Sequence, residues 1–107
     1  MKLYDEYPQA LRVLHGELNL ANKTESLRLY SAIKVIADEF HDVIEANKKD
    51  FPQQGLYLSE KIGLFVSGLK LAVMPVENSS NTPQQWLEIA RQNLEKVEMS
   101  VPDRKSN

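Results

Sequence analysis

The clearest helical pattern in the chain spans residues 24–48, TESLRLYSAIKVIADEFHDVIEANK. Its apolar residues recur every three or four positions, which places them on one broad face of a helix that lies against a core. They are Leu29, Tyr30, Ile33, Ile36, Ala37, Phe40, Val43 and Ile44. We expect Thr24 to cap this helix, because a threonine oxygen can accept a hydrogen bond from the first turn. At 1.5 Å per residue the helix is about 37 Å long, so it is the longest element predicted.

Three further segments show helical spacing. The first covers residues 5–20, with Pro8 in its opening turn, and we expect it to end between residues 19 and 23. A break at residues 50–55 separates the long helix from a segment at residues 59–74. The last segment begins at Thr82 and runs to about residue 98. Its opening, Thr82-Pro83-Gln84-Gln85, has the form of a capping box with proline at the first helical position.

The segment at residues 59–74 is apolar on two sides. One stripe contains Ile62, Phe65, Val66, Leu69, Ala72 and Val73, and the second contains Leu64 and Leu71. An alternative is a pair of strands, residues 64–66 and 69–73, joined by a tight turn at Ser67-Gly68. We prefer the helix, because the series of apolar positions at i, i+3, i+4 and i+7 is complete.

These patterns predict an all-α fold, a small four-helix bundle-like domain with the second and third helices at its centre. The 107 residues match the size of one domain. We expect residues 1–99 to form this domain and residues 100–107 to form a flexible polar tail.

Composition argues against several classes of function. The net charge of −2 supplies no general attraction to nucleic acid or to anionic lipid, so a nucleic-acid partner is disfavoured. Cysteine is absent, which excludes disulfides and thiolate metal sites. We expect no signal peptide, because the N-terminus turns acidic at once and lacks an apolar run. We expect no membrane-spanning segment, because the apolar run at residues 62–76 is interrupted and too short. A cytoplasmic location is the resulting prediction.

The strongest chemical candidate lies on the long helix, where Asp38, His41, Asp42 and Glu45 share one side. Carboxylates and imidazole at this spacing could supply part of a divalent-metal site. We prefer a solvated face, because the ridge points away from the predicted core and Lys34 and Lys49 stand four residues from its carboxylates. Glu39-x-x-Asp42 resembles one acidic pair of the all-α nucleotide pyrophosphohydrolases, but the companion pair is missing, so no family is assigned.

No other catalytic motif is present. The four glycines form neither a dinucleotide-binding fingerprint nor a phosphate-binding loop, and no serine stands in a Gly-x-Ser-x-Gly motif. We expect His15 to lie on the polar side of the first helix. The sequence therefore predicts a protein without enzymatic activity and without a cofactor.

The second apolar stripe on residues 59–74 predicts a binding surface. Leu64 and Leu71 would stay exposed in a monomer, and Gly68 between them would let a second helix approach closely. We expect a non-enzymatic protein-binding module, a small regulator, inhibitor or immunity-type partner, that acts through Leu64, Gly68 and Leu71 as a homodimer. The alternatives are a metal-dependent enzyme that uses the acidic helix face and, third, a DNA-binding regulator.

Overall fold

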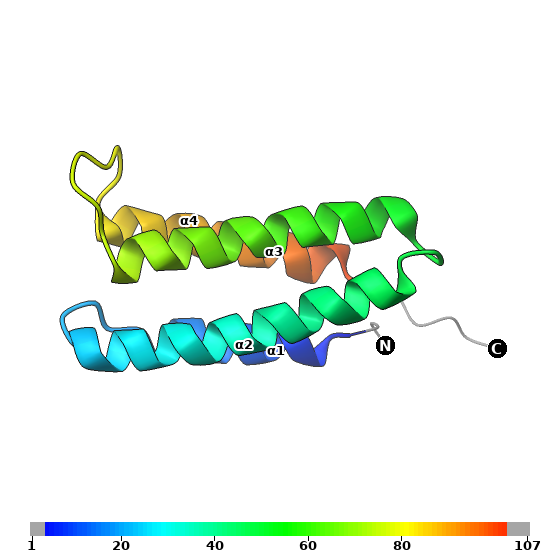
Figure 1. The fold of residues 1–107 in the computed structure, drawn as a ribbon, viewed down its shortest axis with the longest axis horizontal. Coiled ribbons are helices and arrows are strands. Elements are labelled where there is room, and N and C mark those ends of the chain that lie inside the picture. Colours follow the sequence, from blue (N-terminus) through cyan, green and yellow to red (C-terminus); the bar gives the residue numbers. More distant parts are fainter. Residues whose placement is uncertain (1–3, 103–107) are drawn as a thin grey trace.

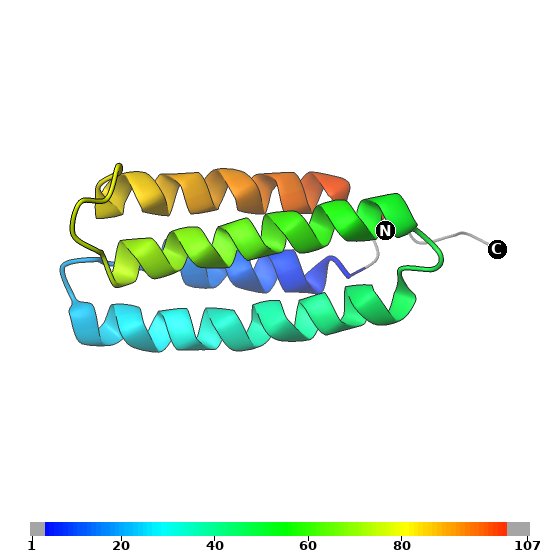
Figure 2. The ribbon, with the colours of Figure 1, turned by 45° about the horizontal axis from the view of Figure 1, so that its top comes forward.

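Four helices form the part of the chain that the computed structural model describes, residues 4–102 (Figure 1). They are α1 (Glu6–Gly16), α2 (Lys23–Asn47), α3 (Pro52–Val73) and α4 (Pro83–Ser100). Consecutive helices run antiparallel, and α1 packs against both α2 and α4 (Figures 1 and 2). The predicted all-α, four-helix bundle fold is confirmed. The alternative of two strands between residues 64 and 73 is wrong, because α3 covers all of these residues.

The core is built from one face of each helix. The two largest side chains that are fully buried are Phe40 of α2 and Phe65 of α3. Other members of the core are Leu11, Ile33, Ala37, Ile44, Leu58, Ile62, Leu69, Ala90, Leu94 and Val97. The ring of Tyr7 stacks on that of Phe40 with 5.0 Å between the ring centroids, which joins α1 to α2. Burial of a side chain of this size contributes about 1.5–3 kcal/mol relative to leaving it in water.

Helix α2 follows its prediction closely, except at its cap. The core positions are confirmed, although Ile36 and Val43 are only partly buried. The helix is capped by Asn22, whose side-chain oxygen accepts a hydrogen bond from the Glu25 backbone N–H at 3.1 Å. The prediction of Thr24 as the cap is therefore wrong. Asparagine and threonine are both favoured at this position, so the local signal did not separate them.

Helix α3 begins at Pro52, about two turns before the predicted start at Ser59. Proline is well suited to the first turn of a helix, where its missing N–H is not needed. Gly55 then lies against the end of α2. A Cβ atom at this position would be 3.6 Å from Cγ2 of Ile44 and 3.1 Å from the Cβ atom of Lys48, the residue after the helix. Residues 52–55 of the predicted break therefore begin the helix, whereas residues 50 and 51 do lie between the two helices. The extension adds Leu56 and Tyr57 to α3.

Helix α1 ends at Gly16, one turn before its predicted end. Glycine is a weak helix former, and here Gly16 is the last helical residue. Leu18 and Leu20 still pack against the core, but from the connection that leads to α2. The predicted helical conformation of residues 17–20 is therefore wrong, although Leu18 and Leu20 contact the core.

The capping box at the start of α4 is confirmed. The Thr82 N–H donates to the side-chain oxygen of Gln85 at 2.7 Å, and the Gln85 N–H donates to the Thr82 hydroxyl oxygen at 3.1 Å. The other end of the helix differs from its prediction. Ser100 is helical, and Val101 and Pro102 are buried, so the predicted flexible tail does not begin at residue 100. Residues 103–107 lie outside the described part of the chain.

Candidate functional site

The outer face of α3, which is turned away from the core, carries a set of exposed apolar side chains. Leu56 is 73% exposed, Leu64 43%, Tyr57 39% and Met74, directly after the helix, 38%. At 3.6 residues per turn, these four side chains fall within an arc of roughly 100°. Single exposed apolar residues are ordinary on protein surfaces, whereas a set that shares one helix face is typical of an interaction surface.

The structure places the three predicted partner-binding residues differently. Leu64 lies on the outer face of α3, and Leu71 is half-buried at its edge. Gly68 is buried against α4, where an added Cβ atom would be 3.3 Å from the Cβ atom of Ala90 and 3.4 Å from the carbonyl oxygen of Trp86. The close helix approach expected at Gly68 therefore occurs inside the chain, between α3 and α4. Gly68 is not part of an exposed surface.

Gly63 lies on the outer face of α3 and has open space beside it. No atom lies within 4 Å of the position of an added Cβ atom at Gly63, apart from those of its own helix turn. Ser67, one turn further along α3, is exposed as well. The middle of this face is consequently shallow, with larger apolar side chains on either side of it. The sequence prediction did not include Leu56, because it began the helix after that residue.

The acidic face of α2 is exposed, as predicted. Asp38 pairs with Lys34 at 3.2 Å, and Glu45 pairs with Lys48 at 3.0 Å in place of the predicted Lys49. His41 is less closely bound, with its Nε2 atom 3.8 Å from Glu45. The hydrogen bond from Lys48 is the main reason that the pKa of Glu45 lies below its ordinary value.

These side chains do not assemble a metal centre. Within residues 4–102, no three His, Cys, Asp or Glu residues are arranged so that they could hold a metal ion. Asp38 and His41 instead border an open hollow of about 370 Å³ between α2 and α3. Its other lining residues are Ala37, Ser59, Ile62, Gly63, Val66 and Ser67. The hollow therefore continues the shallow middle of the outer face of α3 toward α2.

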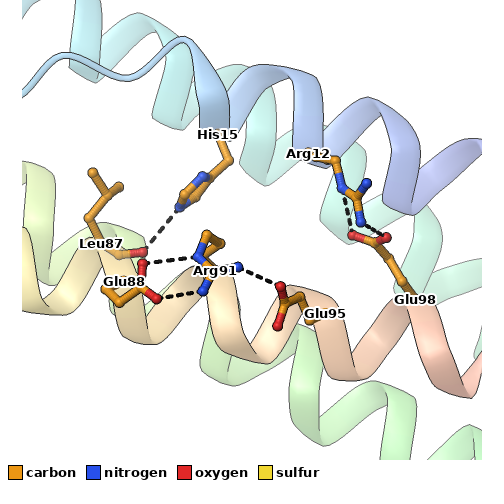
Figure 3. Close-up of polar contacts among 7 residues, drawn as sticks. All are labelled: Arg12, His15, Leu87, Glu88, Arg91, Glu95 and Glu98. Atoms are coloured by element: carbon orange, nitrogen blue, oxygen red, sulfur yellow. Dashed lines mark hydrogen bonds and ion pairs between the residues drawn. The ribbon is translucent and has the colours of Figure 1, made fainter.

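A second polar feature, which sequence reasoning missed, joins α1 to α4 (Figure 3). We call it the polar seam; it consists of Arg12, His15, Glu88, Arg91, Glu95 and Glu98. Arg12 reaches across to Glu98 with two hydrogen bonds. His15 lies 3.1 Å from the carbonyl oxygen of Leu87, so its Nε2 atom carries the proton in this contact. His15, which was predicted to lie on the polar side of the first helix, is half-buried among polar groups between α1 and α4.

Arg91 occupies the middle of the polar seam, between two carboxylates of its own helix. It donates to Glu88 at 2.6 Å and also to Glu95 (Figure 3). The hydrogen bond from Arg91 is the largest cause that holds the pKa of Glu88 below its ordinary value, and the two carboxylates raise the pKa of Arg91. A hollow of about 380 Å³ opens beside these groups. Both arginines that line it are paired with carboxylates, so neither one is a free cation for an anionic ligand.

We expect the Arg12–Glu98 pair to contribute little to stability. Arg12 is largely exposed, and solvent-exposed ion pairs are worth about 0–1 kcal/mol. An Arg12→Ala protein should lose less than about 1 kcal/mol of its free energy of unfolding in a urea titration followed by circular dichroism. A loss of several kcal/mol would show instead that this pair holds α1 on the bundle.

No protein-family model matches the chain, and neither a curated protein nor a solved structure matches it. Over residues 4–102, none of the helices is long and apolar enough to cross a membrane. The acidic face of α2 and the polar seam are largely paired internally, as described above. The outer face of α3, with Met74 directly after it, leaves four large apolar side chains exposed, more than any other helix between residues 4 and 102.

Proposed function

We propose that this protein is a non-enzymatic protein-binding module that acts through the outer face of α3, and that its partner on this face is a second copy of the chain. The single observation that supports the proposal most is the joint exposure of Leu56, Tyr57, Leu64 and Met74 on one helix face. Among residues 4–102 the other helices carry fewer exposed apolar side chains, namely Val13 on α1, Leu27 and Val35 on α2, and Met99 on α4. We also propose a cytoplasmic location, with which the absence of cysteine agrees.

Pairing of two copies through this face would remove the apolar side chains from water. Burial of the exposed parts of Leu56 and Leu64 would contribute roughly 2–3 kcal/mol per subunit before the costs of association. Each copy presents the same surface, so a two-fold arrangement satisfies both copies at once and closes the assembly as a dimer.

The proposal predicts that wild-type protein elutes as a dimer and that a Leu56→Glu/Leu64→Glu protein elutes as a monomer with unchanged helix content. Two glutamates would carry uncompensated charge into the interface, where a buried charge without a partner is strongly unfavourable. Size-exclusion chromatography with light scattering gives the mass of each protein. Circular dichroism checks that the variant remains folded.

A matched control uses the same change at exposed apolar positions away from α3. Val13 of α1 and Val35 of α2 are 61% and 66% exposed. A Val13→Glu/Val35→Glu protein should therefore remain a dimer. A monomeric wild type at concentrations up to about 1 mM, where association is worth only about 4 kcal/mol, would refute self-association as the function of this face.

A further inference from the structure

The outer face of α3 carries its side chains in a self-complementary order. Six exposed positions follow the alternating spacing of four and three residues that keeps a stripe on one side of a helix. We call them the α3 stripe: Leu56, Glu60, Gly63, Ser67, Lys70 and Met74. From either end the order is apolar, charged, small, small, charged, apolar, and the two charges are opposite in sign. The stripe is about 27 Å long, from the helical rise of 1.5 Å per residue.

We propose that two copies of the chain pair through the α3 stripe with their α3 helices antiparallel, about a two-fold axis level with Phe65. This inference rests on the proposed function and specifies how the outer face of α3 is covered. Leu56 then faces Met74 of the second copy, Glu60 faces Lys70, and Gly63 faces Ser67. The two-fold axis repeats each pair, so the six side chains of each copy all find partners.

The charges select this direction over the parallel one. In a parallel pair, equivalent positions meet, so Glu60 would face Glu60 and Lys70 would face Lys70, which is unfavourable. In the antiparallel pair each carboxylate faces an ammonium group. Both groups are available for such contacts: Glu60 lies a loose 3.9 Å from Lys61, and Lys70 makes no ion pair with any residue between 4 and 102.

The small side chains allow the two helices to come close at the centre. Packed helices lie about 8–10 Å apart, depending on the side chains between them. Gly63 has open space around it, and Ser67 adds only a hydroxymethyl group. The centre of the stripe therefore permits an approach at the short end of this range. That approach brings Leu56 and Met74, at the two ends, into contact range of each other across the axis.

Charge reversal tests the direction of pairing. Glu60→Lys and Lys70→Glu should each raise the dimer dissociation constant at least about tenfold, because each places two like-charge pairs across the axis. The double variant Glu60→Lys/Lys70→Glu restores opposite charges and should return to within about threefold of wild type. An equal mixture of the two single variants should form a heterodimer. Sedimentation equilibrium gives the dissociation constants, and unchanged values for both single variants would overturn the antiparallel pairing.

Engineered cysteines give an independent measure, because the chain contains no cysteine of its own. Disulfide formation requires Cα atoms within about 7 Å. A mixture of Leu56→Cys and Met74→Cys proteins should form a mixed disulfide under mild oxidation, whereas each protein alone should not cross-link, since its two thiols would stand about 27 Å apart. A Val35→Cys protein is the control, because it measures the disulfide that forms through random collisions of exposed thiols.

The outcomes separate the two proposals. A mixed disulfide together with a dimeric wild type supports the antiparallel pair. If wild type is a dimer but the Leu56→Cys protein cross-links to itself, the antiparallel pairing is overturned and the proposed function still stands. A wild type that sediments as a monomer, together with a mixture of Leu56→Cys and Met74→Cys proteins that cross-links no more than the Val35→Cys protein, would overturn both.

Discussion

A Phe65→Ala protein is expected to lose about 3–5 kcal/mol of its free energy of unfolding, the range typical of a phenylalanine removed from a core. Phe65 is fully buried in the middle of α3, on the side opposite its outer face. Its ring also lies 6.2 Å from that of His15, so the same residue joins α3 to α1. The alanine would leave a cavity that neighbouring helices can fill only in part.

Urea unfolding followed by circular dichroism measures this loss. Small domains are stable by about 5–15 kcal/mol, so the variant should unfold at a clearly lower urea concentration or fail to fold at all. Val35→Ala provides the control, because Val35 is largely exposed and should change stability by no more than about 0.5 kcal/mol. Equal losses in the two proteins would mean that Phe65 is not a core residue.

The elements that could be predicted from sequence are those with a local signal. The core face of α2 follows from its apolar spacing, and the start of α4 follows from Thr82, Pro83 and Gln85 within one turn. Both signals are contained in a single helix. They therefore do not depend on how the other helices pack.

Features that depend on two distant segments could not be predicted in the same way. Arg12 meets Glu98 across 86 positions of sequence, and no local pattern links them. The orientation of α3 about its own axis is another such feature, because a helix that is apolar on two sides could bury either of them. Its neighbours decide that Leu69 points to the core and Gly68 to α4. The three residues predicted to bind a partner consequently do not lie on one face, because Gly68 is turned to α4 and Leu64 to the outside.

Two glycines of α3 offer the sharpest test of that orientation. Gly68→Leu is expected to destabilise the fold by about 1–3 kcal/mol, the cost typical of overpacking. Its Cβ atom would be 3.3 Å from the Cβ atom of Ala90 and 3.4 Å from a backbone oxygen of α4, so α3 and α4 would have to separate. The better helix propensity of leucine would offset about 1 kcal/mol at most.

The same substitution at Gly63 is expected to act in the opposite direction on the fold. Gly63→Leu enters open space, so the gain in helix propensity should raise the free energy of unfolding of the monomer by about 0.5–1 kcal/mol. It should also block the antiparallel dimer, because its side chain fills the place where the second α3 approaches. Urea unfolding at low concentration measures the first effect, and light scattering at high concentration measures the second. If Gly63→Leu destabilises the monomer while Gly68→Leu does not, the orientation of α3 described here is wrong, and with it the position of the α3 stripe.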